Sequence, residues 1–379
     1  MPRSQAPPGP IRPSIKDIIG KAPWSPLEAH LDGLRERVDT SVREAHHLRA
    51  RYREELVRDQ PELLGMIQRP SDQAMEQARS LLQGGSVAAA DGTVSAVPLL
   101  SGSKIQVGVV IVFNRGKVVD LVTRVFEHDL ARSGNSATEF FTQLRKARTV
   151  SVLVSRAVML FGERRLLLDQ ETDWRMLHGE LIPHELRTGA GRPELNLPPT
   201  FDLIHEYIKT EQFIAVSESS GDIDILNAAV LLEPGEYLVI RSLTDTLTTF
   251  MNGDPETGQG RANFEKPDIE RFRRFIETAG PQVAVVLVRA GSKPFLLECH
   301  QKRVDEAVAL FMADSLWTRG IGADGAGAVR GFPYHLDLAD QVAGTLFKGS
   351  DFARFVESRL MSLGVDEGLM DIDARRTRQ

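Results

Sequence analysis

The chain has 379 residues, of which 42% are hydrophobic and 26% are charged, and its formal net charge is −6. This composition is that of an ordinary globular protein with a sizeable core, and the length predicts one large elaborated domain or two domains. The single cysteine, Cys299, excludes a disulfide framework and a four-cysteine zinc site. The acidic balance excludes a surface that binds nucleic acid all over, so any DNA contact must be local.

No hydrophobic run reaches the roughly 18 residues of a membrane span, and the first 13 residues lack the apolar segment of a secretory signal. We therefore expect a cytoplasmic protein with no membrane partner. Residues 1–26 are rich in proline and predict a flexible arm, and residues 365–379 are expected to form a flexible tail.

The first predicted element is a long helix over 27–56, where apolar residues recur at steps of three and four. This apolar stripe is expected to pack either on its own domain or on a second subunit. A shorter helix is predicted over 72–83, before the end signal Gly84-Gly85. Residues 27–83 are therefore expected to form a helical arm that precedes one larger domain over 84–364.

The larger domain begins with three predicted strands at 86–98, 104–114 and 117–127, joined by short turns as in an antiparallel meander. A long helical segment follows over 136–168. The later elements are strands predicted at 175–182, 213–219, 236–243, 282–290 and 294–300, and helices over 302–317 and 334–361. This order predicts an α/β fold, with a core of mixed sheet and helices at both ends.

Several segments resemble familiar functional motifs but lack the neighbouring elements or residues that those motifs require. GIGADG (320–325) has dinucleotide-binding spacing, but it follows a helix rather than a strand and predicts a loop. HGELIPHEL (178–186) is not H-E-x-x-H, and the chain lacks the P-C-x-x-C half of a zinc deaminase. It also contains neither a P-loop nor a G-x-S-x-G elbow.

One pair of acidic residues remains as a candidate site. Asp91 ends a buried strand before Gly92, a pattern that is also typical of an ordinary turn. Glu163 lies on the helix that follows the meander. Carboxylates so placed can bind Mg²⁺ or Mn²⁺, and such ions can clamp the oxygens of a phosphodiester. Basic residues near Glu163 are predicted to contact phosphate: Arg145, Lys146, Arg148, Arg156, Arg164 and Arg165.

Three segments resemble the NurA family of DNA nucleases and occur in the family's order. AAADGTVSAV (88–97) is similar to the family's first catalytic strand, which has Val-Asp-Gly-Ser. HGELI (178–182) falls where the family has Asp-Gly-Ser-Leu. RGFPYHLDLADQVA (330–343) resembles the closing motif, Gly-Tyr-Pro-Tyr followed by Leu and an Ala-His or Ala-Asp pair. The resemblance covers about two-thirds of the chain.

This resemblance implies an RNase H-like fold and a homodimer that encloses a central channel. It implies a Mn²⁺-dependent deoxyribonuclease, with 5′–3′ exonuclease and single-strand endonuclease activity on DNA ends; Mg²⁺ is the second candidate ion. It also implies a HerA-type hexameric ATPase as partner in DNA-end resection and double-strand break repair. A channel lined with basic residues would reconcile DNA binding with the acidic net charge.

The resemblance assigns roles to particular residues. Asp91 and Glu163 match metal carboxylates of the family, whereas His178 replaces its second aspartate. His178 could bind metal through an imidazole nitrogen, which suits Mn²⁺ better than Mg²⁺, or could be structural. Glu180, expected two residues on in the same strand, would supply the lost carboxylate. Residues expected to support the site or bind DNA are Arg164, Arg165, Phe332 (a Tyr in the family), Tyr334 and Asp340 (a His in the family).

Three hypotheses stay open. The chain is an active nuclease, a catalytically weakened NurA-like subunit that binds DNA or HerA without cutting, or an unrelated α/β scaffold with an Asp-Gly turn. For the first, we expect Asp91, Glu163 and either His178 or Glu180 to point into one cleft.

Overall fold

The computed structural model of the chain describes residues 14, 16, 27–59, 61–99, 102–115, 118–131, 136–218, 225, 228–229, 231–253, 264–317, 331–347 and 349–364. The predicted loop at GIGADG (320–325) and the predicted tail (365–379) lie outside these residues, and so does nearly all of the predicted N-terminal arm.

The contacts within the chain divide it into two compact units, Met1–Pro61 and Glu62–Gln379. In the first unit, α2 (Leu27–Asp59) is one continuous helix over the predicted span. Its stripe includes exposed apolar side chains, among them Val38 (48% exposed) and Val42 (61% exposed). The predicted helical arm, 27–83, also includes α4 (Asp72–Gly84), whose buried apolar side chains lie in the core of the second unit.

The second unit is built on one sheet of eight strands, in the order β3-β2-β1-β4-β5-β8-β7-β6. β1 (Val87–Leu99), β2 (Gly102–Arg115) and β3 (Val118–Ala131) form the predicted antiparallel meander. β4 (Trp174–His178) and β5 (Phe213–Ser217) run parallel to β1. The antiparallel strands β8 (Pro294–His300), β7 (Val283–Arg289) and β6 (Glu236–Ser242) complete it. The first five strands have the order and directions of an RNase H-like core, which confirms the predicted fold class.

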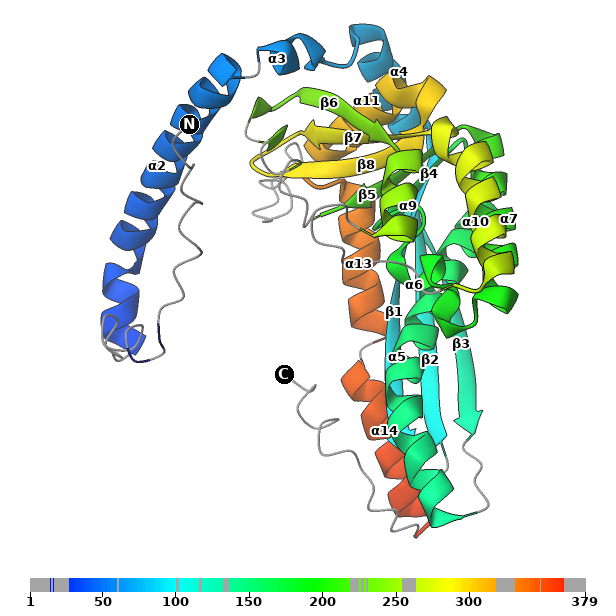
Figure 1. The fold of residues 1–379 in the computed structure, drawn as a ribbon. Coiled ribbons are helices and arrows are strands. Elements are labelled where there is room, and N and C mark those ends of the chain that lie inside the picture. Colours follow the sequence, from blue (N-terminus) through cyan, green and yellow to red (C-terminus); the bar gives the residue numbers. More distant parts are fainter. Residues whose placement is uncertain are drawn as a thin grey trace, which may run out of the picture. The chain divides into compact units, whose positions relative to one another are not determined.

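Helices cover both faces of this sheet (Figure 1). Successive residues of a strand point to opposite faces: Ala88 and Ala90 pack on one helical layer, and Val87 and Ala89 pack on the other. The first layer contains α5 (Ala137–Leu168), α7 (Pro193–Thr210), α9 (Leu243–Asn252) and α10 (Lys266–Ala279). The second contains α4, α11 (Val304–Trp317) and α13 (Tyr334–Leu346), and α14 (Gly349–Ser362) follows α13. The short helices are α3 (Glu62–Met66) and α6 (His184–Arg187).

The sequence patterns missed α7, because it contains three prolines. Pro193 occupies the first turn, where a missing N–H costs little, but Pro198 and Pro199 lie inside the helix and remove hydrogen bonds. The helix forms nevertheless because one face is buried, including Phe201 and Tyr207. Tertiary packing therefore outweighs the local preference. The helices α9 and α10 were not predicted either.

β4 is shorter than the strand predicted over 175–182. It ends at His178 because Gly179 adopts a left-handed conformation, with φ of 82°, which glycine reaches without a steric penalty. Glu180 therefore does not continue the strand, and the prediction that it shares a strand face with His178 is wrong. None of the helices in the described part of the chain has both the length and the apolar character that a membrane crossing requires.

Candidate metal centre

Asp91 lies where β1 loses its neighbour on one side. The last pair between β1 and β4 is Ala90 with Leu177, so the β4-side edge of β1 is unpaired from Asp91 onward. Asp91 is almost fully buried (6% exposed), and its Oδ1 accepts a hydrogen bond from the backbone N–H of Gly92 at 2.8 Å. The small residues before it and the Asp-Gly step thus hold a carboxylate at a fixed place.

His178, the last residue of β4, lies beside this carboxylate. Its Nδ1 is 3.2 Å from Asp91 Oδ2, and the ring of Phe332 contacts the imidazole edge-on at 5.6 Å between centroids. Burial by itself would lower the pKa of His178, but the hydrogen bond and the negative charge of Asp91 outweigh it, and the pKa is raised above the ordinary value. The imidazole is therefore held as a partner of Asp91.

Asp340, on α13, approaches Asp91 from the same face. Asp91 pairs with Val110 across the sheet, and Val110 packs against Ala339 of α13; directly opposed residues of antiparallel strands share a face. Burial raises the pKa of Asp340, and the negative charge of Asp91 and a side-chain hydrogen bond with Asp91 raise it further. Two carboxyl groups so paired share a proton or need a cation between them.

Glu163 reaches the same region from the α5 layer. A Cβ on Gly92 would lie only 2.6 Å from Glu163 Oε1, so the missing side chain of Gly92 makes room for this carboxylate. Glu163 is 1% exposed. Burial raises its pKa to about 8; Arg164 and His178 oppose this shift, and Asp91 adds to it. Oε2 pairs with Arg164 at 3.3 Å, whereas Oε1 has no hydrogen-bond partner among the residues that the structure describes.

We call Asp91, Glu163, His178 and Asp340 the acid cluster. Three carboxyl groups and an imidazole are the donor types that Mn²⁺ accepts, and the unpartnered, buried Oε1 of Glu163 is an atom that a cation would satisfy. Among the described residues, however, no three His, Cys, Asp or Glu side chains are already arranged as a metal-ligand group, and Asp91 is hydrogen-bonded to His178 and Asp340. The residues fit a divalent ion by chemistry, and its binding would replace these mutual contacts.

Two residues assigned to the site from the sequence point elsewhere. Glu180 forms an ion pair with Arg187, and no contact joins it to Asp91 among those described. Arg164 is fully buried; it donates hydrogen bonds to the carbonyl oxygens of Leu160 at 2.8 Å and Leu181 at 2.9 Å, and also to that of Glu180. The prediction that Arg164 contacts phosphate is wrong, because its guanidinium is used to fix the chain after β4.

The other predicted basic contacts divide into two groups. Arg156 and Arg165 are at the surface, but each is ion-paired: Arg156 with Glu185 at 3.0 Å, and Arg165 with Asp169 and Glu206. The side chains of Arg145, Lys146 and Arg148 lie outside what the structure describes. In the closing segment, Phe332 contacts His178 as described above, and the ring of Tyr334 contacts that of His335, with 5.6 Å between their centroids.

Glu298 and Asp314 are buried acidic residues that the sequence analysis did not anticipate. Glu298, on β8, accepts the backbone N–H of Leu181 at 2.6 Å, and Asp314, on α11, contacts His335 at 2.5 Å. Each is an acidic residue inside a strongly apolar stretch (PFLLECH and ALFMADSL). A charged residue at a position that should be buried is the signal that could have found them.

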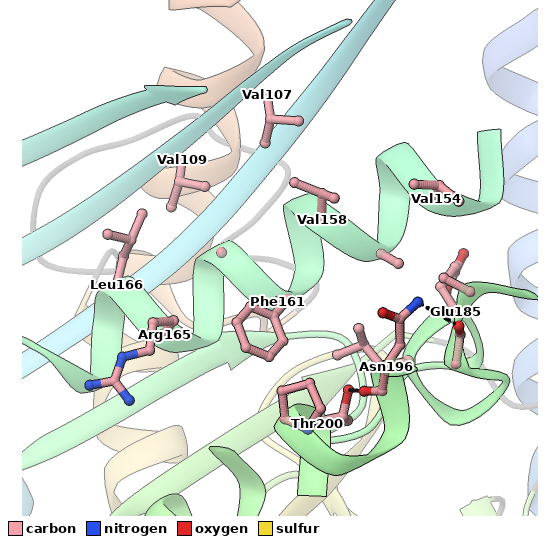
Figure 2. Close-up of a pocket in the computed structure, with 16 residues that line it drawn as sticks. Val107, Val109, Val154, Val158, Phe161, Arg165, Leu166, Glu185, Asn196 and Thr200 are labelled. Atoms are coloured by element: carbon pink, nitrogen blue, oxygen red, sulfur yellow. Dashed lines mark hydrogen bonds between the residues drawn. The ribbon is translucent and has the colours of Figure 1, made fainter. Parts of the chain in front are cut away.

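A separate cavity of about 730 Å³ lies between β2 and the α5–α7 layer. Figure 2 shows Val107, Val109 and Phe161 among its walls. The polar side chains at this cavity are engaged: Glu185 with Arg156, Asn196 with the carbonyl of Gly189, and Thr200 with the carbonyl of Asn196. No member of the acid cluster lines it.

No family model and no curated protein matches the chain. Among solved structures, it is similar to the NurA nuclease from Sulfolobus solfataricus, with 13% identity, 86% of this chain and 98% of that chain covered, and a TM-score of 0.49. A NurA bound to dAMP and manganese is 10% identical, with 90% and 98% covered and a TM-score of 0.43. An endonuclease V from Bacillus subtilis is 12% identical, with 73% and 92% covered and a TM-score of 0.29. The structural neighbours of this chain thus include NurA nucleases, at a level of similarity that does not extend to individual residues.

Proposed function

We propose that the chain is a divalent-metal-dependent deoxyribonuclease whose metal is held by the acid cluster. The observation that carries this proposal is the contact of Asp91 with both His178 and Asp340. Beside Gly92, the next residue of β1, lies the buried Oε1 of Glu163, which has no hydrogen-bond partner among the described residues. Without a cation, burial and mutual repulsion raise the pKa of Glu163 and of Asp340. A divalent ion would replace the protons and relieve that repulsion.

In this proposal Asp340, rather than Glu180, supplies the third carboxylate. Asp340 interacts directly with Asp91, whereas Glu180 is engaged with Arg187. His178 replaces an oxygen ligand by nitrogen, which favours Mn²⁺ over the harder Mg²⁺. A metal so held would act on the phosphodiester as a Lewis acid and activate water; the protein residues fix its ligands, and Phe332 keeps the imidazole in place.

The finer parts of the proposal rest on the sequence resemblance to NurA nucleases. We propose that the protein acts on DNA ends as a 5′–3′ exonuclease and a single-strand endonuclease, and that it forms a homodimer. Its proposed partner is a HerA-type ATPase, with which it would act in end resection and double-strand break repair in the cytoplasm. Phosphate contact would require Arg156 or Arg165 to exchange its present acidic partner for the backbone of DNA, which is a local contact compatible with the net charge of −6.

The test is cleavage of end-labelled linear and single-stranded DNA during titration with Mn²⁺ or Mg²⁺, by the wild type and by Asp91→Ala. We expect cleavage that requires Mn²⁺ and is lost in the variant. Mn²⁺ binding without cleavage, with or without a HerA-type ATPase, would instead favour the alternative of a weakened subunit. An Asp91→Ala protein that cuts at the wild-type rate would refute the proposed site.

A further inference from the structure

A buried Asp–His pair outside the acid cluster links two helices. Asp314 and His335 are both fully buried. The carboxylate of Asp314 accepts the backbone N–H of His335 at 3.1 Å with Oδ2 and meets the ring Nδ1 at 2.5 Å with Oδ1. We propose that this pair consists of positioning residues that hold α13 where Asp340 meets Asp91; the inference rests on the proposed metal site.

The pair acts at the beginning of α13. The first amides of a helix have no partner within it, and the N-cap of α13, Pro333, makes no side-chain hydrogen bond. Asp314, from α11, therefore caps α13 from outside and simultaneously holds the side chain of His335. One carboxylate thus fixes both the end of the helix and its rotation about its axis.

The residues just before α13 are fixed to the same core. Gly331 has φ of 80°, and a Cβ on it would lie 2.3 Å from the backbone N of Gly291, so the two backbones touch. The ring of Phe332 packs between Phe295 (5.5 Å) and His178 (5.6 Å). These two contacts and the Asp314–His335 pair together fix residues 331–335. They hold this segment against the β7–β8 hairpin, the end of β4 and α11.

The position of α13 matters for the acid cluster because of how the helix rests on the sheet. Ala339 and Ala343 pack on Val110 and Val112, and α13 runs along β1 on the face opposite to α5 (Figure 1). The alanine contacts set how close the helix lies to the sheet, and the Asp314–His335 pair holds its first turn. The short side chain of Asp340 keeps its contact with Asp91 only if both are held.

The pair is also polar where an apolar residue would be easier to bury. Nε2 of His335 is buried and meets no hydrogen-bond partner within the described part of the chain, which costs folding free energy. The other ring nitrogen of His335 is bonded to the carboxylate of Asp314. The orientation that this bond imposes on α13 accounts for a histidine at such a site. This is the way in which residues behind metal ligands support them.

The experiment compares His335→Leu with His335→Asn in the full chain. Leucine fills similar space but loses the bond from the ring to Asp314, whereas the asparagine Nδ2 takes the place of Nδ1 and restores it. We expect His335→Leu to weaken Mn²⁺ affinity about 10-fold or more, with cleavage recovering at saturating Mn²⁺. We expect His335→Asn to remain within about threefold of the wild type. Without metal, hydrogen exchange of the α13 amides should rise in His335→Leu only.

The matched control is Leu203→Ala, which opens a cavity in the opposite helical layer and should lower the melting temperature without changing Mn²⁺ affinity. A His335→Leu protein with wild-type Mn²⁺ affinity would overturn the inference and leave the proposed function intact, as would a His335→Asn protein as weak as His335→Leu. A wild type that binds no Mn²⁺ would refute the proposed function, and the inference with it.

Discussion

His178 Nδ1 lies 3.2 Å from Asp91 Oδ2, one residue beyond the last pair that joins β4 to β1. The end of one strand and the newly unpaired edge of its neighbour thus bring an imidazole and a carboxylate together. Asp340 meets the same carboxylate from α13. Binding of a cation would have to compete with these contacts, so substitutions in the acid cluster should affect the metal-free and the metal-bound protein differently.

Asp340→Asn should show whether Asp340 or Glu180 supplies the third carboxylate of the metal site. It removes the charge but not the volume, and we expect Mn²⁺ affinity to fall about 10- to 100-fold, as for the loss of a ligand or its support. Isothermal titration with Mn²⁺ measures this. Asp337→Asn, on the same helix, is the control, since Asp337 accepts a hydrogen bond from Gln341 at its surface. Equal affinities for the two variants, or a larger loss in Glu180→Gln, would contradict the assignment.

Asp91→Ala should abolish cleavage without unfolding the protein. The charge of Asp91 raises the pKa of buried Glu163, so its removal relieves repulsion. We therefore expect the melting temperature without metal to be unchanged or higher, and the increase that Mn²⁺ gives the wild type to be absent. Thermal unfolding with and without Mn²⁺ measures both. A large loss of stability without metal would indicate that Asp91 is mainly structural.

The strands of the core were predictable because β-branched residues fill them, and Asp91 was found because it follows four small apolar residues before a glycine. Glu163 was found from its place on the helix after the meander. The sequence did not indicate that Asp340 lies next to Asp91, because this contact depends on how α13 packs on Val110. Such a contact between distant segments leaves no local periodicity in the sequence.

The wrong predictions also have physical causes. Glu180 was assigned a strand face because the left-handed turn at Gly179 was not recognised. Arg164 and Arg165 were both predicted to contact phosphate because they lie beside Glu163, but neighbouring residues of a helix point about 100° apart. One of them faces the carbonyl oxygens after β4 and the other faces solvent. Composition alone could not distinguish the two.

His178→Asp should change the metal preference. An additional carboxylate in place of imidazole supplies an oxygen ligand, which serves Mg²⁺ as well as Mn²⁺. We expect cleavage to be retained or increased, and the ratio of rates in Mn²⁺ and Mg²⁺ to fall toward one. His184→Asp, outside the acid cluster, should leave this ratio unchanged. Loss of cleavage in both ions would instead assign His178 a role that a carboxylate cannot fill.

Glu298→Gln should alter how stability depends on pH. Burial raises the pKa of Glu298 from 4.5 to about 7, and the charge of Glu180 adds to this shift. The folded state binds this proton more tightly than the unfolded state, so the contribution is fully present below pH 4.5 and is lost as pH rises through 7. Glutamine keeps an acceptor for Leu181 and cannot ionise. Relative to wild type, the variant should gain about 2–3 kcal/mol between pH 5 and pH 8.

Urea unfolding at pH 5 and pH 8 measures the free energy of unfolding of the variant and of the wild type. Groups that titrate alike in both proteins cancel when the two values are subtracted. Glu211→Gln is the control: the hydrogen bond from Lys302 lowers the pKa of Glu211, so its contribution to stability is lost only as pH falls below 4.5, and its difference from wild type should hardly change between pH 5 and pH 8. A Glu298→Gln protein whose stability follows that of the wild type at both pH values would contradict the prediction.

The apolar stripe of α2 should mediate assembly. Val38 and Val42, one helical turn apart, are exposed in the single chain, and apolar side chains in such a row favour contact with a second subunit or partner. We expect the full chain to be a dimer by light scattering, and Val38→Glu with Val42→Glu to weaken either the dimer or its binding to a HerA-type ATPase by at least tenfold. His47→Glu places a single glutamate off the stripe and should do neither. If the double variant keeps both the dimer and the binding of the ATPase, α2 has no part in assembly, and the surface of the second unit must supply the contact.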